Sequence, residues 1–285
     1  MNEKLEKPSA SVVIPTSGSA GYLDVTLASV MPQARRAGAE VIVVLDGPDA
    51  SSEAVAERHG ARLAVLPGHR GLNRARNAGI RQARGELIAF IDDDVEAPAG
   101  WLDALLQGAA SAPEREVFGG PIRARLEGGP RGCGREPPPI TTLDFGPEDR
   151  DVPHVWGANM MIRRSAFERL GEFDAALSGR GDEEEWLMRY LAAGGRIRYL
   201  ARAGLAHRRS ARDARLPALT RAAYRQGRES RRHDARMGKP RPVRAELRVL
   251  AGCAWHTVAR RCAFGIVMGA RAAGGLREAI AQGRR

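Results

Sequence analysis

Hydrophobic and polar positions follow one another in blocks along the first third of the chain, and the blocks predict strands and helices in turn. Unbroken apolar runs, typical of strands buried on both faces of a parallel sheet, occur at 11–15, 40–45, 62–66 and 87–91. Between these runs, apolar residues at helical spacing predict helices over 22–37, 51–58 and 72–83. The alternation predicts an α/β fold with a mostly parallel sheet and right-handed crossovers.

The strand at 87–91 ends in three consecutive acids, Asp92, Asp93 and Asp94. Open α/β sheets place their ligands at the carboxyl ends of strands. In extended chain Asp92 and Asp94 point the same way and can share one hard cation. Because like charges raise the cost of ionising one another, a divalent metal that carries a phosphate gives a reason for the cluster that packing does not. The alternative is a solvated acidic turn.

The chain has 285 residues, enough for one large α/β domain with an appendage or for two small domains. Its net charge of +11 is uneven, because residues 1–195 carry 22 basic and 29 acidic side chains whereas residues 196–285 carry 23 and 5. The change in composition near Gly194 and Gly195 marks the tail as a separate functional element.

Cys133, Cys253 and Cys262 are widely spaced and odd in number, without a CxxC pair. This spacing argues against a disulfide framework or a zinc site and fits a reducing compartment. Residues 1–7 lack the apolar core of a signal peptide, and the late apolar run 263–270 is too short to span a membrane. These features favour a cytoplasmic protein, with peripheral contact at the inner face of the membrane left open.

Several short motifs follow one another along the chain, namely Val12–Thr16, Val43–Gly47, Ala75–Gly79, Asp92–Asp94, Trp156–Arg164, Phe167–Asp174 and Gly181–Arg189. In this order they resemble the motifs of the GT-A fold glycosyltransferases of family 2, and the resemblance covers about residues 10–210. The resemblance implies a Rossmann-like, mostly parallel sheet flanked by helices. It implies a catalytic domain over 8–210, with a nucleotide-binding half at 8–125 and an acceptor half at 126–210, followed by a basic, mainly helical extension at 211–285.

The resemblance also implies metal-dependent transfer of a sugar from a nucleoside-diphosphate sugar to an acceptor hydroxyl, with inversion. Asp94 is expected to bind Mn²⁺ or Mg²⁺ directly, Asp92 to share the metal or face ribose and sugar, and Asp93 to matter less. His207 stands where many relatives supply a third ligand, and its imidazole favours Mn²⁺. A lone histidine is also commonly a surface or satisfied residue, which is the alternative for His207.

For the donor, the resemblance implies contacts from Pro15 and Thr16 and a hydrogen bond from base or ribose to Asp46. The chain has Leu45 before Asp46 where the family usually has a second acid, so the base that is read stays open. Arg76 is expected to reach base or phosphate, with an ordinary solvated helix face as the alternative.

Four acids at 182–185 stand at the start of a predicted helix. The helix dipole favours acids there, but capping needs one or two of them, not four. An inverting transferase needs a carboxylate that takes the proton from the attacking hydroxyl. The resemblance places Glu183 at this position, with Asp182 as the alternative. A pocket for acceptor and sugar is expected to be lined by Trp156, Gly157, Ala158 and Asn159. Trp156 has a core position as its alternative.

The tail predicts a helix at 216–232 and combines apolar residues with arginines between 246 and 271. A basic amphipathic helix favours contact with an anionic membrane surface. Packing on the catalytic domain, an acidic acceptor or nucleic acid are the alternatives. Aromatic residues do not interleave with the basic ones, which argues against nucleic acid.

Two other functions remain open. A sugar nucleotidyltransferase usually has a basic phosphate loop after its first strand, and Thr16–Gly21 lacks a basic residue. A non-catalytic scaffold that binds membrane or nucleic acid through the tail would not need the Asp92 and Asp94 pair. The irregular segment 126–152 is expected to cover the acceptor site.

Overall fold

The computed structural model describes residues 7–130, 132–135, 138–177, 183–236, 238 and 240–283. The chain forms two compact units. Among the described residues, one comprises 7–123, 143–177 and 183–207, and the other comprises 124–142 and 208–283. Residues 126–142, expected in the acceptor half, therefore group with the C-terminal helices. The division at 210 stays a prediction.

The first unit is built on an eight-stranded sheet in the order β3-β2-β1-β4-β9-β6-β10-β8. Its strands are β1 (Ser11–Thr16), β2 (Glu40–Leu45), β3 (Arg62–Val65), β4 (Leu87–Ile91), β6 (Val117–Gly119), β8 (Arg150–Val152), β9 (Asn159–Arg163) and β10 (Ile197–Tyr199). The first four strands pair in parallel, whereas β9 runs antiparallel between β4 and β6. Every residue of β1, β2 and β4 is buried, which confirms the apolar runs as central strands of an α/β fold.

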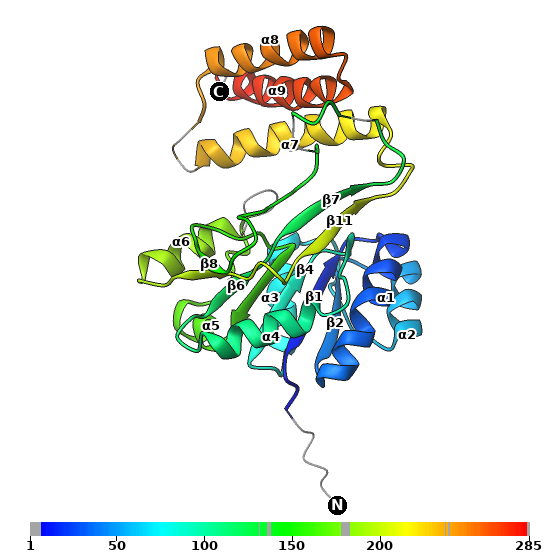
Figure 1. Cartoon of the computed structure of the whole chain (residues 1–285), viewed down its shortest axis with the longest axis vertical. Helices are drawn as coiled ribbons and strands as arrows, with labels where there is room; N and C mark the ends of the chain where they lie inside the picture. Colours follow the sequence, from blue (N-terminus) through cyan, green and yellow to red (C-terminus); the bar gives the residue numbers. More distant parts are fainter. Residues whose placement is uncertain are drawn as a thin grey trace, which may run out of the picture. The chain divides into compact units, whose positions relative to one another are not determined.

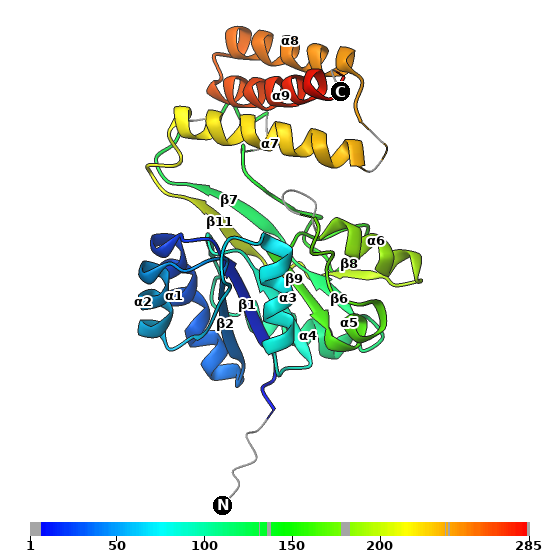
Figure 2. The ribbon, with the colours of Figure 1, turned by 180° about the vertical axis from the view of Figure 1, so that it is seen from behind.

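Six helices accompany this sheet among the described residues. They are α1 (Ala20–Ala37), α2 (Ala50–His59), α3 (Leu72–Gln82), α4 (Trp101–Ser111), α5 (Arg164–Leu170) and α6 (Glu184–Ala192). Helix α3 covers one face of the sheet, and α1 and α4 cover the other (Figures 1 and 2). Helix α3 lies close to β1, because a Cβ atom on Gly79 would stand 2.3 Å from a methyl group of Val13. This close packing holds the last turn of α3 against the middle of β1.

A small sheet in the order β5-β11-β7 adds one contact that matters for function. Its strands are β5 (Val95–Glu96), β11 (Leu205–Arg209) and β7 (Ile122–Leu126). In the antiparallel pair of β5 and β11, His207 lies opposite Val95. The pairing therefore places His207 next to the residue that follows the three acids.

The second unit contains α7 (Leu216–Arg236), α8 (Val243–Arg260) and α9 (Ala263–Gln282), with α9 between the other two (Figure 1). The apolar stretch 246–271 is thus divided between two helices rather than forming one, and the chain turns at Arg261 with a φ of 48°. The buried apolar cluster of the second unit is small, with Leu219, Ala223 and Val267 at the centre. None of the described helices is long and apolar enough to cross a bilayer.

Candidate active site at the carboxyl ends of the strands

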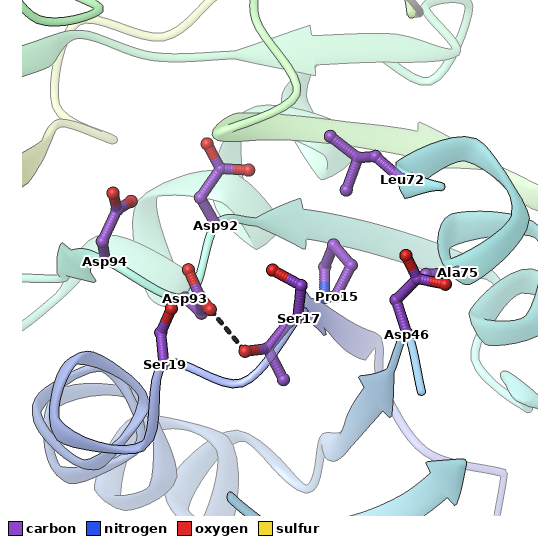
Figure 3. Close-up of a pocket in the computed structure, with 10 residues that line it drawn as sticks. Pro15, Ser17, Ser19, Asp46, Leu72, Ala75, Asp92, Asp93 and Asp94 are labelled. Carbon is purple, nitrogen blue, oxygen red and sulfur yellow. Dashed lines mark hydrogen bonds between the residues drawn. The ribbon is translucent and has the colours of Figure 1, made fainter. Parts of the chain in front are cut away.

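A cavity of about 290 Å³ opens where β1, β2 and β4 end. It is lined by Pro15, Thr16, Ser17, Ser19, Asp46, Leu72, Ala75, Asp92, Asp93 and Asp94. Figure 3 shows Asp46, at the end of β2, across the cavity from the three acids that follow β4. The parallel strands bring these residues together because their carboxyl ends meet at one edge of the sheet. Six residues predicted to bind donor or metal therefore share one cavity.

Asp92, Asp94 and His207 form a group of metal-ligating side chains. One ligand atom from each lies within 4.8 Å of the others. His207 is 4% exposed, and its Nε2 atom lies 3.1 Å from Oδ1 of Asp94. Two carboxylates and one imidazole suit Mn²⁺ or Mg²⁺, with the nitrogen favouring Mn²⁺. The pairing of β11 with β5 thus supplies the third group that the linear sequence places over a hundred residues away.

The electrostatics of the acids fit a bound cation. Burial, and then the charge of Asp94, raises the pKa of Asp92 to about 6. The same two causes raise the pKa of Asp93 to about 7, although a hydrogen bond from Thr16 acts in the opposite direction. A divalent cation would favour the ionised carboxylates and offset this cost. The donor set and its crowded charges therefore agree with the expected metal.

The loop that carries the acids is held by Thr26 of α1, a fully buried residue. Its hydroxyl oxygen lies 2.8 Å and 2.6 Å from the carbonyl oxygens of Asp93 and Val95, and it accepts from the Val95 N–H at 3.2 Å. Thr26 was not predicted as a site residue. Its only signal in the sequence is a hydroxyl at an inward position of an amphipathic helix.

Asp46 holds the loop that leads into α3. Its carboxylate accepts from the backbone N–H groups of Arg70, at 2.5 Å, and Gly71, at 3.0 Å. The side chain is 9% exposed and still lines the cavity. A single aspartate at the end of β2 thus shapes the cavity wall. Its predicted contact with base or ribose remains a prediction.

Arg76 lies beside Glu183 in a buried cluster, and it is absent from the cavity lining. It is 2% exposed, and its Nη1 atom lies 3.6 Å from Oε2 of Glu183. Oε1 of Glu183 accepts from the backbone N–H of Gly157 at 3.1 Å. A Cβ atom on Gly157 would stand 2.2 Å from Nη2 of Arg76, so only glycine leaves room for the guanidinium. Asp182, the alternative base, lies outside the described residues.

Two asparagines fix the helix that carries Arg76. Asn73 donates to the carbonyl of Asp174 at 3.0 Å, and Asn77 donates to the carbonyl of Phe173 at 2.8 Å. Asn77 also accepts from the Phe173 N–H at 3.1 Å. The motifs Ala75–Gly79 and Phe167–Asp174 are therefore joined by hydrogen bonds between the side chain of Asn77 and the backbone of Phe173, which no local pattern predicted.

The segment predicted to line the acceptor and sugar pocket has mixed exposure. Trp156 is half-buried, with its ring centroid 4.7 Å from that of His154, and Ala158 is buried. Asn159 is fully buried, accepts from the Trp101 indole N–H at 3.0 Å and donates to two backbone carbonyls. The amide of Asn159 therefore fixes the start of β9.

Four residues of the cavity lining were not predicted as site residues. They are Ser17, Ser19, Leu72 and Ala75. The serines follow β1 in a Thr-Ser-Gly-Ser turn, which is the signal that could have placed them at the strand end. Leu72 and Ala75 lie near the start of α3. Ala75 stands in the motif Ala75–Gly79, whereas Leu72 had no comparable signal.

Comparison with known proteins agrees with the fold. Residues 11–171 match the family described as "Glycosyl transferase family 2". The pre-mycofactocin glycosyltransferase of Mycobacterium tuberculosis is 31% identical over 206 residues, which cover 69% of this chain and 42% of the relative. The validoxylamine A glucosyltransferase of Streptomyces hygroscopicus is 29% identical over 210 residues, covering 62% and 50%. The chain thus spans about half the length, or less, of these two relatives.

Two solved structures resemble the chain. The mannosyltransferase PcManGT from Pyrobaculum calidifontis, in complex with GDP-Man and Mn²⁺, matches with a TM-score of 0.57 and 18% identity over 96% of this chain and 76% of its own. TarS of S. aureus matches with a TM-score of 0.56 and 19% identity over 75% of this chain and 39% of its own. The likeness shows the GT-A fold. Because the family match spans more than half of its residues, the chain belongs to glycosyl transferase family 2.

Proposed function

We propose that the chain is a metal-dependent glycosyltransferase that moves a sugar from a nucleoside-diphosphate sugar to an acceptor hydroxyl with inversion. One observation carries the proposal. Asp92, Asp94 and His207 converge within 4.8 Å, and both aspartates line the cavity that Pro15, Thr16 and Asp46 also line. A nucleotide site and a cation site at one strand edge match the two parts of such a donor.

In this proposal the nucleoside occupies the side of the cavity formed by Pro15, Thr16 and Asp46. Asp46 orients the N–H groups of Arg70 and Gly71 at the entrance to α3 and accepts from base or ribose. Asp93 is hydrogen-bonded to Thr16 and fixes the floor of the cavity. The donor is thus held by groups that the strands and the α3 loop already orient.

Asp94, Asp92 and His207 would hold Mn²⁺ or Mg²⁺, with Asp94 as a direct ligand. When bound, the metal would neutralise the charge that develops on the departing nucleoside diphosphate. Asp92 lies close enough to Arg76 and His207 for their charges to favour its ionised form, against the effects of burial and Asp94. These side chains therefore keep the donor's diphosphate at the end of β4.

Glu183 is proposed to take the proton from the acceptor hydroxyl as that oxygen bonds to the anomeric carbon and the bond to the diphosphate breaks. Gly157 and Arg76 position its two carboxylate oxygens from different sides. Arg76 is thereby proposed to orient the base, in place of its expected contact with base or phosphate. Trp156 and Ala158 are proposed to line the acceptor pocket beside it, and Asp182 remains the alternative base.

The test is donor binding and turnover with a small panel of nucleotide-sugars. GDP-mannose is one probe because PcManGT holds it, and UDP-glucose is another because validoxylamine A glucosyltransferase is named for glucosyl transfer. We expect at least one donor to raise the melting temperature only with Mn²⁺ or Mg²⁺, and to be hydrolysed slowly without acceptor. Release of pyrophosphate from a nucleoside triphosphate and a sugar phosphate would instead identify a nucleotidyltransferase. Failure of every donor with either metal would favour a scaffold.

We also propose that α8 contacts an anionic membrane surface, which would place the protein at the inner face of the membrane. One side of this helix exposes Leu247, Trp255 and Val258, which are 49%, 62% and 79% exposed. Arg244 and Arg248 are exposed on the same helix. Apolar side chains between arginines are complementary to anionic headgroups and the acyl chains beneath them.

Sedimentation with liposomes tests the membrane proposal. Binding is expected with anionic vesicles at low salt, and it should weaken at high salt and in a Trp255→Ala, Val258→Ala double variant. Val65→Ala, an exposed valine of β3, serves as the matched control. Absence of binding at low salt, or equal binding to neutral vesicles, would contradict the proposal.

A further inference from the structure

A second group of metal-ligating side chains lies within the second unit. Cys133 comes from residues 132–135, His256 from α8 and Cys262 from the position just before α9. One ligand atom from each lies within 4.8 Å of the others. The wide spacing of the cysteines argued against a zinc site, but the fold brings two of them together with a histidine.

The separations of these side chains are close to those of a tetrahedral metal site. Sγ of Cys133 lies 3.3 Å from Nε2 of His256, and the ligand atoms of all three residues lie within 4.8 Å of one another. The backbone N–H of Cys133 also donates to Sγ of Cys262 at 3.3 Å. Zinc bonds of about 2.3 Å to sulfur and about 2.0 Å to nitrogen place tetrahedral ligand atoms about 3.5–3.8 Å apart. The three groups can therefore meet one ion with small side-chain adjustments.

Cys262 is prepared to act as a thiolate. Burial opposes its ionised form, but hydrogen bonds from His256 and from backbone N–H groups outweigh burial and lower the pKa of the thiol to about 7. Its place at the N-terminus of α9 acts in the same direction. Metal binding requires deprotonated thiols, so a lowered pKa favours it.

We propose that Cys133, His256 and Cys262 form a Zn²⁺ site that ties residues 132–135 to helices α8 and α9. Two thiolates and one imidazole are a soft donor set, which selects Zn²⁺ over Mn²⁺ and Mg²⁺. Three protein ligands leave one tetrahedral position for water or another ligand. Cys133 is exposed, which gives an ion a route from solvent.

The second unit also has a structural use for such a link. Helix α8 contributes no buried side chain, and the buried cluster of the unit centres on Leu219, Ala223 and Val267. Helices with little apolar burial gain little from hydrophobic packing, and small units of this kind are commonly held by metals or disulfides. An ion at this site would join α8, α9 and the loop at one point.

The experiment measures zinc in the full chain, independently of any glycosyl transfer. The reduced protein is stripped of metal and titrated with Zn²⁺ against a chromogenic chelator, and with Co²⁺ to detect thiolate charge-transfer absorption. We expect about one tightly bound Zn²⁺ per chain with sulfur ligation. Since loss of a group that merely orients a ligand costs about 10–100-fold in affinity, Cys133→Ser, His256→Ala and Cys262→Ser should each weaken binding by about 100-fold or more.

Two matched controls separate this site from the rest of the molecule. Cys253→Ser removes the one cysteine outside the cluster and should keep Zn²⁺ affinity and the cobalt spectrum. Asp94→Asn should lose the response to Mn²⁺ and keep both zinc signals. Circular dichroism of each variant shows whether it is folded. Zn²⁺ binding by the unmodified chain tests the site even where a variant does not fold.

Three results would overturn the proposal. The first is absence of Zn²⁺ binding in the reduced, unmodified chain. The second is binding that survives in both Cys133→Ser and Cys262→Ser. The third is a Cys133–Cys262 disulfide that re-forms in place of metal binding, detected by mass spectrometry of peptides alkylated before and after reduction.

Discussion

Each of the two units of the chain is stabilised internally in a different way. In the first unit the central strands are buried along their whole length, and Phe90, Phe167, Phe173 and Trp186 pack ring to ring with centroid distances of 5.0–6.1 Å. In the second unit the apolar cluster is small, and helices meet through glycine contacts and charged groups. A large apolar core leaves polar residues available for chemistry, whereas a small core makes polar residues serve the structure.

The charged residues show this difference directly. Asp92, Asp93 and Asp94 crowd at one strand end, where burial and mutual repulsion raise two of their pKa values. Glu278 of α9 lies between Arg228 and Arg232 of α7, whose side chains lower its pKa. The first arrangement costs stability and suits a ligand, and the second stabilises the fold. Substitutions of the acids at the strand end should therefore change activity, whereas substitution of Glu278 should change stability.

Asp94→Asn is expected to give the largest effect, on chemistry alone. Loss of a direct metal ligand should lower the transfer rate by about 10³-fold or more, equivalent to about 4 kcal/mol in the barrier. Removing one of three crowded charges should not lower the melting temperature of the metal-free protein. The measurements are turnover against Mn²⁺ concentration and thermal unfolding. Asp103→Asn, on α4 outside the cavity lining, is the control. A lower melting temperature of metal-free Asp94→Asn would contradict the contrast between the two units.

Glu183→Gln should reduce transfer by about 10²–10⁴-fold, the usual value of a general base. Donor affinity should not change, because the donor cavity does not include Glu183. Initial rates and donor-dependent thermal shifts measure the two effects separately. Glu184→Gln is the matched control in the same helix turn. If Glu183→Gln keeps the full rate while Asp182→Asn is inactive, the base has been assigned to the wrong residue.

Gly157→Ala tests whether the position of Arg76 matters. The new methyl group would collide with the guanidinium, displace Glu183 and lower the rate by about 10²-fold, as small errors of position can do. Gly21→Ala is matched, since a Cβ atom there meets nothing within 4 Å. It should leave activity unchanged. Equal rates for the two variants would show that Arg76 does not orient the base.

The nucleotide-binding part of the fold could be predicted because its signals are local. Each apolar run between 11 and 91 became a strand within one residue of its predicted bounds, and the helices between them followed with shifts of one or two residues. The acids at 92–94 could be placed because a strand end fixes where its next residues lie. Parallel strands then bring Thr16 and Asp46 to the same edge without further information.

Residues that depend on long-range pairing could not be predicted from local pattern. The place of His207 comes from the register of β11 on β5, and the resemblance to a family was needed to suggest it. The burial of Arg76 depends on Gly157 and Glu183, which approach from other segments. The chain turns at Arg261, which has a left-handed conformation although it is not a glycine. Since no glycine or proline marks this turn in the sequence, the division of 246–271 into two helices was not predicted.

In the second unit, Gly227→Ala should lower stability and leave donor binding intact. A Cβ atom at this position would stand 1.9 Å from the carbonyl oxygen of Arg271, so α7 and α9 must move apart at a cost of about 2 kcal/mol. Hydrogen exchange of the amides in α7 and α9 measures the loss. Gly252→Ala, which meets nothing within 4 Å on α8, should be neutral or stabilising by about 0.5 kcal/mol.

Glu278→Gln is expected to give the smallest effect, and one that depends on pH. Hydrogen bonds, first from Arg232 and also from Arg228, outweigh burial and hold the pKa of Glu278 below its ordinary 4.5. The stabilisation is therefore present above about pH 4.5 and is lost as the pH falls through the folded-state pKa. Since the side chains of Arg228 and Arg232 are 39% and 46% exposed, water screens the pairs, and the loss should be about 1 kcal/mol.

Unfolding of α7 and α9 by hydrogen exchange, compared at pH 7 and pH 3, measures this effect. The chain and Glu278→Gln should differ most at pH 7, and the difference should shrink as the pH falls below 4.5, because protonation removes the charge of the glutamate. Glu229→Gln, an exposed acid on α7, should change stability by less than about 0.5 kcal/mol at both values. If the difference between the chain and Glu278→Gln did not shrink on acidification, shape rather than charge would hold this contact, and the contrast between the two units would rest on packing alone.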